Sequence, residues 1–536
     1  QEKEIIFTMG VVPKKSKNKK LVKIVENYRK PEKVEEAFQE QQNFWNDYLQ
    51  NVQVSTPDND LNRMLNIWNQ YQTSVTFQFS RDASYHHGGM LFGRGFRDSC
   101  QDIMGPVLAQ PEWVKERIIE MAKYQFKDGS TYHLYYPETG GGERTGHSDT
   151  PLWLPMAIIT YLKETGDMKF LEEKAPFHNA KSGTILEHLF SAIDYALSDL
   201  TERGLAKFGP GDWNDTLDYL GRQGKGESVW VTMFLAYNLR ETVQLCEYLG
   251  KTDKAAHYKD HYQKIKKTLN DKCWDGEWYI RGTNDIGEKI GSSDNEEGQI
   301  FLNTQSWAII SGIAKGKRAQ KCLDSVQKHL ETRKGPKILH PPYTKIDDNI
   351  GLATRCVPGK KENGAVFNHP VSWAILAETI LDNGDKAFEI YKKALPMNSE
   401  IDIDRYEVEP YVYAEYVTSP DHPTYGQASH SWLTGSSTWM LRDGIDSILG
   451  VKPHYNGLEI SPSIPSKWDS YQIKRNFRGI DFLIKVDNPE HLNSGVQKMN
   501  INGTTIQGNF INLEDDHIQE LISDKNKVEV KITLEK

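Results

Sequence analysis

From about Asp60 to Leu449 the chain repeats an amphipathic pattern, in which apolar side chains recur at every third or fourth position. That spacing lines up the apolar side chains along one face of a helix, where they can be buried. Several segments end in stop signals such as Gly166-Asp167 or Asn383-Gly384. The pattern predicts helices over Trp113–Tyr124, Leu152–Lys163, Ile185–Leu200, Val229–Leu249, Ala255–Leu269, Trp307–Ile313, Val371–Leu381 and Trp439–Leu449.

With weaker segments included, the pattern predicts about a dozen helices joined by alternately short and long loops. This alternation favours helical hairpins that close into an (α/α)6 barrel over residues 56–449, so the predicted fold is mainly α. An open helical solenoid is the alternative, although the sequence has no regular repeat period.

Both ends of the chain depart from the helical pattern. Residues 450–536 are β-rich and divided by turns such as Asn502-Gly503, which predicts a C-terminal antiparallel β-sandwich. Residues 1–55 predict a short strand at Glu4–Met9 without partners, then a basic turn and a charged helix over Glu32–Gln50 that serves as a linker. The predicted C-terminal strands are Leu458–Pro462, Tyr471–Arg475, Ile480–Val486, Val496–Ile501 and Val528–Leu534.

Composition narrows the class of protein. The 536 residues carry 65 basic and 74 acidic side chains, intermixed along the chain, and the formal net charge is -9. This charge argues against nucleic-acid or membrane-surface partners. No apolar run approaches the length of a membrane span. The five cysteines are scattered, odd in number and without metal-ligand spacing, which favours a reducing compartment and a cytoplasmic location.

The loop Phe208–Asp215 carries the most distinctive chemistry. Gly209, Pro210 and Gly211 forbid a helix there, so the loop presents two carboxylates, an indole and an amide within four positions. Carbohydrate sites use an aromatic platform for a sugar face and a carboxylic acid to protonate a leaving oxygen. The alternative is a structural loop, in which Asp212 or Asn214 caps a helix and Trp213 packs in the core.

Three other polar, glycine-rich segments lie between predicted helices. The first, Phe79–Asp102, contains arginines and Asp98, a carboxylate suited to gripping adjacent sugar hydroxyls; an internal Arg–Asp ion-pair network is the alternative. In the second, Gly359–Pro370, His369 stands at a helix N-terminus, where an anion is favoured. A satisfied structural histidine is the alternative there.

The third segment runs from Glu409 to Ser437. Thr434, Gly435 and the following serines can form an anion-binding nest of hydroxyls and backbone N–H groups. Ordinary N-capping by Thr434 or Ser436 is the alternative reading. The sequence has no Walker loop, Rossmann fingerprint, metal-ligand spacing or nucleophile elbow.

Taken together and in this order, the segments resemble glycoside hydrolase family 94, the cellobiose and chitobiose phosphorylases. The resemblance runs from about Asn69 to the C-terminus. Its motifs are Asn69-Gln70-Tyr71, Phe96-Arg97-Asp98-Ser99, Ser148-Asp149-Thr150-Pro151-Leu152-Trp153-Leu154, Gly211-Asp212-Trp213-Asn214-Asp215, Gly226-Glu227-Ser228-Val229-Trp230, Lys361-Glu362-Asn363-Gly364, Glu409-Pro410-Tyr411 and Trp432-Leu433-Thr434-Gly435.

The resemblance implies an inverting phosphorolysis of β-glycosides, with inorganic phosphate as co-substrate and no cofactor or metal. It also implies a homodimer, and an N-terminal β-sandwich of which Glu4–Met9 would be the last strand. Carried over by position, the general acid is Asp215. The implied donor-sugar contacts are Arg81, Asp98 and Trp213, the sugar-site carboxylate is Glu362, and the phosphate site is His369, Thr434 and Gly435.

Three departures from the family pattern bear on substrate identity. Phe92 stands where many members have an arginine, and Arg94, two positions on, is the candidate to replace it; Glu415 stands where the family has glutamine. Cys356 replaces a tyrosine of the cellobiose phosphorylases. The alternatives to a cellobiose-like phosphorylase are therefore a phosphorylase of the cellobionic acid type with an acidic acceptor, an inverting hydrolase with Glu362 or Glu415 as base, and a non-catalytic sugar-binding protein.

Overall fold

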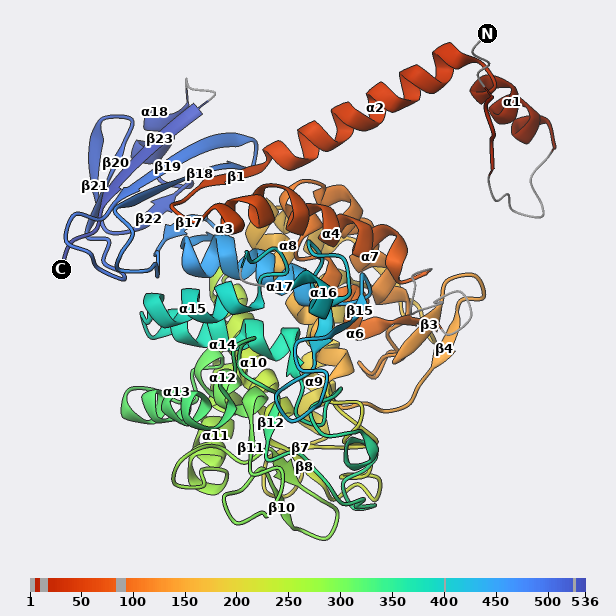
Figure 1. The fold of residues 1–536 in the computed structure, drawn as a ribbon, viewed down its shortest axis with the longest axis vertical. Coiled ribbons are helices and arrows are strands. Elements are labelled where there is room, and N and C mark those ends of the chain that lie inside the picture. Colours follow the sequence, from red (N-terminus) through yellow and green to blue (C-terminus); the bar gives the residue numbers. More distant parts are fainter. Residues whose placement is uncertain (1–4, 10–17, 83–92, 400–401, 524–526) are drawn as a thin grey trace. The chain divides into compact units, whose positions relative to one another are not determined.

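The computed structural model describes residues 5–9, 18–82, 93–399, 402–523 and 527–536 (Figure 1). It forms two compact units, Gln1–Asn51 and Val52–Lys536. The fold is mainly α. Within the described residues, no helix combines the length and the apolar character that crossing a membrane requires. All five cysteines lie in the described part of the chain, and all are free thiols.

The first unit contains helices α1 (Asn18–Tyr28) and α2 (Pro31–Gln50). Helix α2 confirms the predicted charged helix, and it begins with a proline at its first position, where a missing N–H costs nothing. The predicted strand at Glu4–Met9 is wrong over its described part, because Ile5–Met9 has no regular structure and Phe7 and Met9 are almost fully exposed. A strand needs hydrogen bonds from a neighbour, and no described segment pairs with this one.

The second unit is built mainly from antiparallel pairs of helices. Helices α7 and α8, α10 and α11, α12 and α13, and α14 and α15 pack pairwise, and all eight helices predicted in this region are present. Two have different bounds: the helix predicted over Trp307–Ile313 begins five residues earlier, at Leu302, and the helix predicted over Trp439–Leu449 is α-helical only to Arg442 and continues as a π-helical turn over Asp443–Ile448. The bounds are α4 (Asn69–Val75), α6 (Phe96–Asp102), α7 (Pro111–Lys123), α8 (Trp153–Thr165), α9 (Ile185–Ser198), α10 (Val229–Tyr248), α11 (Thr252–Lys272), α12 (Leu302–Ile310), α13 (Lys317–Leu330), α14 (Asn368–Ile380), α15 (Gly384–Ala394) and α17 (Ser436–Arg442).

Alternate helices form the interior of this unit. Helix α8 packs on α10, α10 on α12, α12 on α14 and α14 on α17, and every residue of α12 is buried. Helices α11, α13 and α15 instead bury one stripe and expose a charged face. Each of these five interior helices contributes one tryptophan to the core, and consecutive rings from α10 onward lie 5.4–5.9 Å apart between centroids. The five are Trp153, Trp230, Trp307, Trp373 and Trp439.

Short strands lead into several helices of this unit. Strand β2 (Arg94–Gly95) precedes α6, β8 (Glu227–Ser228) precedes α10, and β13 (Val366–Phe367) precedes α14. Strand β13 also pairs with β14 (Ala414–Val417), which pairs with β15 (Ala428–Ser431) ahead of α17. The polar segments singled out in the sequence therefore reach the N-terminal ends of the interior helices, where unpaired N–H groups favour anions.

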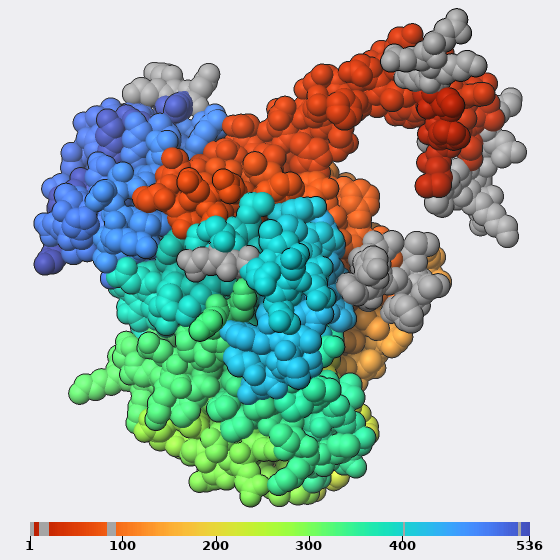
Figure 2. All heavy atoms as spheres, viewed as in Figure 1, coloured from red at the N-terminus to blue at the C-terminus, as the bar shows by residue number. Residues whose placement is uncertain are grey.

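The C-terminal residues form two sheets, and in the space-filling view they make one contiguous mass, drawn in blue (Figure 2). All five predicted C-terminal strands are present. The larger sheet has the order β1-β18-β19-β23-β20-β21 and the smaller has the order β16-β17-β22. Their bounds are β1 (Val52–Ser55), β16 (Val451–His454), β17 (Gly457–Ile460), β18 (Ser470–Phe477), β19 (Ile480–Asp487), β20 (Lys498–Ile501), β21 (Thr504–Gln507), β22 (Phe510–Asn512) and β23 (Lys527–Thr533).

Two features of the larger sheet differ from the prediction. Strands β19 and β23 pair in parallel, so the sheet is mixed rather than antiparallel. Parallel neighbours need a long crossover instead of a tight turn, and the chain between them supplies one that includes α18 (Asp516–Ile522). Strand β1 pairs with β18, so residues assigned by sequence to the linker are part of this sheet.

Candidate active site

A cavity of about 170 Å³ lies at the N-terminal ends of the interior helices, and eight of the ten predicted site residues line it. A larger cavity of about 720 Å³ lies beside α15, where Lys392 and Lys393 pair with carboxylates. We assign the site to the smaller cavity because arginines, carboxylates and an aromatic ring converge on it. The eight residues are Arg81, Asp98, Trp213, Asp215, Glu362, His369, Glu415 and Thr434.

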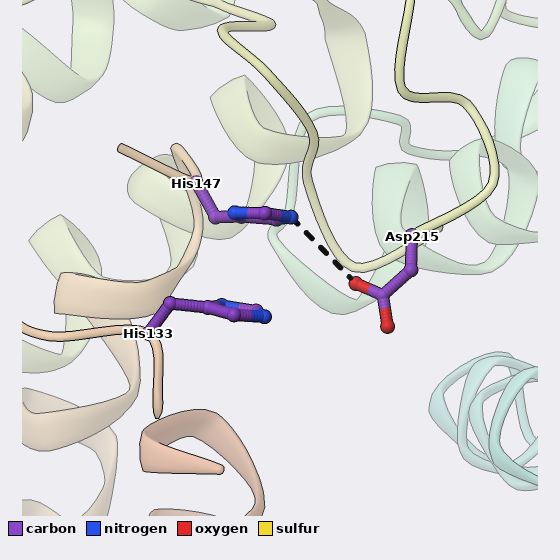
Figure 3. Close-up of side chains that lie close together, drawn as sticks. All are labelled: His133, His147 and Asp215. Atoms are coloured by element: carbon purple, nitrogen blue, oxygen red, sulfur yellow. Dashed lines mark ion pairs between the residues drawn. The ribbon is translucent and has the colours of Figure 1, made fainter. Parts of the chain in front are cut away.

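Asp215 is the accessible carboxylate of the Phe208–Asp215 loop, with a side chain that is 59% exposed. Its Oδ1 accepts a hydrogen bond from Nη2 of Arg97 at 2.8 Å and lies 3.9 Å from Nε2 of His147 (Figure 3). The His147 ring stacks on that of His133, with centroids 3.8 Å apart. Burial, followed by the charge of Arg97, lowers the pKa of His133 to about 4.

Asp212, the other carboxylate of this loop, is fully buried and structural. Its oxygens accept hydrogen bonds from Arg281 Nη2 at 2.6 and 2.7 Å, from Ser228 Oγ at 2.7 Å and from the Asn214 backbone N–H at 2.9 Å. The Asn214 amide oxygen also accepts from Arg281, at 2.9 Å. Asp212 and Asn214 therefore have structural roles, which they fill through Arg281 and Ser228 and not by capping a helix.

Arg81 follows a π-helical turn, Thr76–Ser80, and is buried beneath the cavity. It donates two hydrogen bonds to Asp102, at 2.7 and 2.9 Å, and another to the carbonyl of Leu433. It therefore holds the loop that carries Thr434. Asp98 lies 3.8 Å from Arg81, and although burial works the other way, Arg81 and Arg97 lower the pKa of the Asp98 carboxyl. The Arg–Asp ion-pair network, given above as the alternative for this segment, therefore forms part of the cavity wall.

Glu362 is buried and faces the Asp215 loop. Its carboxylate accepts hydrogen bonds from the backbone N–H of Thr216 at 2.8 Å, from the Thr216 hydroxyl, and from Asn214 Nδ2 at 3.4 Å. Burial, followed by repulsion from Asp215, raises the pKa of Glu362 to about 7. Near neutral pH a large fraction of Glu362 therefore carries a proton, which it can donate to a sugar hydroxyl.

Glu415, on β14, faces the cavity beside Lys361. Nζ of Lys361 lies 3.2 Å from its Oε2. Burial raises the pKa of the Glu415 carboxyl, while the Lys361 charge opposes that shift. The residue at the glutamine position of the family thus belongs to an ion pair in this chain. Such a pair brings no net charge to the sugar site.

His369, the second residue of α14, is buried against Trp213, with ring centroids 5.6 Å apart. Its Nδ1 lies 3.4 Å from the Thr434 hydroxyl, and its Nε2 has no hydrogen-bond partner among the described residues. Burial lowers the pKa of His369 to about 3. A β-carbon on Gly435 would come within 3.2 Å of Nε2, so only glycine leaves this space open.

The structure separates one predicted residue from this group. Arg94 does not line the cavity among the described residues; it pairs with Asp82 and lies 3.6 Å from Glu120. Phe92, part of the same departure from the family pattern, lies outside the described residues, as does the stretch Ala83–His87.

Three residues that touch Asp215 or its neighbours were not predicted from the sequence, namely Arg97, His133 and His147. The signal for two of them was present, because Arg97 and His147 lie inside or directly beside segments already singled out. His133 had no such signal, since it reaches the site only through the pairing of β3 (Leu134–Tyr136) with β2 and β4 (Gly141–Glu143).

Comparison with known proteins identifies the type of chain. A family model described as "Glycosyl hydrolase 94 superfamily, catalytic domain" matches residues 44–450. Solabiose phosphorylase from Paenibacillus borealis is 36% identical over 86% of this chain and 58% of its own length. N,N'-diacetylchitobiose phosphorylase from Vibrio proteolyticus is 33% identical over 90% of this chain and 63% of its own length. The chain thus spans about three fifths of these relatives.

A solved structure shares the fold at low sequence identity. The GH78 family rhamnosidase of Bacillus sp. GL1 matches with a TM-score of 0.55 and 15% identity, over 83% of this chain and 43% of that one. At this identity the match concerns the fold alone.

Proposed function

The chain belongs to the glycosyl hydrolase 94 superfamily, and we propose that the protein it forms part of is an inverting phosphorylase of β-linked disaccharides or short oligosaccharides. Asp215 acts as general acid on the leaving oxygen. Inorganic phosphate attacks the anomeric carbon from the opposite face of the sugar. Inversion of a β-glycoside then gives an α-sugar 1-phosphate and a shortened acceptor.

One observation carries the proposal. Buried His369 directs an Nε2 without a partner among the described residues toward Gly435, in the cavity that also contains Asp215. A buried nitrogen without a partner is costly, so a ligand atom is expected there. An uncharged imidazole with Nε2–H can donate to a phosphate oxygen, and the N-terminus of α14 favours the same anion.

The rival activities make different demands on the site. An inverting hydrolase needs a carboxylate base that activates water. Glu362 accepts three hydrogen bonds from Asn214 and Thr216, and Glu415 pairs with Lys361. Both carboxylates are thus already engaged with protein groups, whereas Nε2 of His369 has no partner among the described residues, and this contrast favours phosphate as the nucleophile over water.

The test is product analysis of the full-length protein on β-linked disaccharides with and without phosphate. We expect α-sugar 1-phosphate, identified by its anomeric NMR signal, only when phosphate is present. Equal release of reducing sugar without phosphate would mean a hydrolase. Sugar binding without turnover on any β-linked disaccharide would mean a non-catalytic sugar binder.

The phosphate site gives a second prediction. His369→Ala and Thr434→Ala should each raise the KM for phosphate roughly 10-fold or more, because a hydrogen bond to a charged group contributes about 1.5–3 kcal/mol. The KM for the sugar should change much less. Steady-state kinetics with each substrate varied in turn measures both. His178→Ala, at an exposed histidine, is the control, and a defect confined to the sugar KM would remove both residues from the phosphate site.

The acceptor is proposed to be neutral and cellobiose-like. Three cations, Arg355, Lys360 and Lys361, flank the segment that leads to Glu362, and positive charge there would suit an acidic acceptor. However, Arg355 pairs with Asp348 at 2.7 Å and Lys361 pairs with Glu415. The reverse reaction with glucose 1-phosphate should therefore prefer glucose or N-acetylglucosamine over gluconate, and Lys360→Ala should leave that order unchanged. A preference for gluconate that Lys360→Ala abolishes would establish the cellobionic acid type instead.

Finer features of the architecture are part of the same proposal. The order in which interior helices pack, with one tryptophan from each of five, supports an (α/α)6 barrel over residues 56–449. Apolar residues from both C-terminal sheets share one core cluster, which supports a sandwich of one mixed and one small antiparallel sheet.

The free thiols support a reducing, cytoplasmic location. A homodimer is proposed on the family resemblance alone.

A further inference from the structure

Two histidines and the proposed acid form a compact cluster at the edge of the cavity. His133, His147 and Asp215 each offer one ligand atom, and these atoms lie within 4.8 Å of one another. In Figure 3 the two rings lie one above the other, each with one nitrogen turned toward the Asp215 carboxylate. The three residues come from separate segments, so the fold itself creates this cluster.

In each ring one nitrogen, Nδ1, lies near a threonine hydroxyl, and the other nitrogen, Nε2, is available to a ligand. Nδ1 of His147 lies 2.6 Å from the Thr145 hydroxyl, and Nδ1 of His133 lies 3.4 Å from the Thr150 hydroxyl. Histidines that bind metals usually have one nitrogen held in this way, which orients the ring and leaves the other nitrogen for the ion. Here the available nitrogen is Nε2 in both rings.

We propose that His133, His147 and Asp215 bind a divalent transition-metal ion such as Zn²⁺, and that this ion inhibits the enzyme. Two imidazole nitrogens with one carboxylate suit Zn²⁺, Ni²⁺ or Cu²⁺, whereas Mg²⁺ and Ca²⁺ prefer oxygen ligands alone. A carboxylate oxygen that coordinates the ion cannot carry the proton for the leaving group. The inhibition therefore rests on the proposed function, but the binding does not.

The cluster needs only a local adjustment to close on an ion. Bonds of about 2.0–2.1 Å in a tetrahedral site bring ligand atoms to about 3.3 Å from one another, closer than the widest separation here. The Asp215 side chain is 59% exposed and can rotate toward the two rings. The ion would replace the contact between Asp215 and Arg97.

The experiment titrates Zn²⁺ into the metal-free chain by calorimetry and follows Co²⁺ binding by visible absorption. We expect one site that His133→Gln or His147→Gln weakens by ~10-fold or more, with Thr145→Val weakening it by a similar factor through the lost ring contact. Thr145 is exposed, so this variant should fold even if a histidine variant does not. The control is His257→Gln, because His257 and His261 form a pair on the surface of α11 and are the obvious adventitious site.

Wild-type affinity in His147→Gln and Thr145→Val would overturn the proposal, as would a site lost only in His257→Gln. A thiolate band in the Co²⁺ spectrum that Cys356→Ser removes would assign the ion to that cysteine instead. In the full-length enzyme, Zn²⁺ should abolish turnover and EDTA should restore it. If the protein proved not to be a phosphorylase, the binding measurements would still decide the metal site.

Discussion

Asp215→Asn is expected to lower kcat by roughly two or more orders of magnitude, because an amide cannot deliver the proton that an essential general acid supplies. Folding should be almost unaffected. The side chain is largely exposed, and its contacts are one hydrogen bond from Arg97 and the neighbouring His147. Sugar binding should also persist, since Asp98, Trp213 and Glu362 still line the cavity.

Three measurements on one preparation check this prediction: kcat in the phosphorolytic direction, sugar affinity by calorimetry, and the thermal midpoint. Asp199→Asn is the matched control, because Asp199 is a half-exposed aspartate that pairs with one lysine and does not line the cavity. A kcat within tenfold of the wild type for Asp215→Asn would exclude Asp215 as the acid. If Asp212→Asn folded normally but lost turnover while Asp215→Asn remained active, the acid would be Asp212 instead.

Much of the helical region could be predicted because the 3.6-residue period records which face of each helix is buried. The tryptophans of α10, α12 and α14 lie on such faces and meet in one cluster. The site could be predicted as a set because its residues occupy loops that lead into interior helices, and those helix ends meet in space. The family resemblance then assigned roles that the residues alone left open.

Other features depend on contacts between distant segments and leave no local pattern. The parallel pairing of β19 with β23 follows from a long crossover, not from the alternation within either strand. Arg94 faces Asp82 and Glu120 instead of the cavity, although its glycine-rich surroundings suited a ligand contact. The stacked pair of His133 and His147 is visible only once β3 and the loop beyond β4 are placed together.

The two aspartates of one loop show this limit most clearly. Asp212 and Asp215 lie three positions apart, yet one is fully buried and the other is largely exposed. The difference comes from Arg281, which is 69 residues from Asp212 in the sequence and directly precedes strand β9 (Gly282–Thr283). The contribution of the buried Asp212–Arg281 pair to stability can therefore be measured separately from catalysis.

Asp212→Ala is therefore expected to destabilise the protein by about 3–5 kcal/mol, because it leaves the Arg281 charge buried without its partner. Arg281 has no exposed surface, so water cannot replace the carboxylate. The variant also removes acceptors for Ser228 Oγ and the Asn214 N–H, which hold the loop that presents Asp215. The urea midpoint of unfolding, followed by tryptophan fluorescence and compared at equal slope, measures this loss.

A double-mutant cycle separates the ion pair from the cavity that the alanine leaves. Asp212→Leu combined with Arg281→Met replaces both charges by apolar groups, and it should cost less than the sum of the two single substitutions. If only the lost volume mattered, the losses in unfolding free energy from the two single substitutions would simply add. The buried ion pair would then not be what holds the loop. Activity should fall in Asp212→Ala together with the folded fraction, whereas Asp215→Asn should lose activity at full stability. The opposite pattern would exchange the roles of the two aspartates.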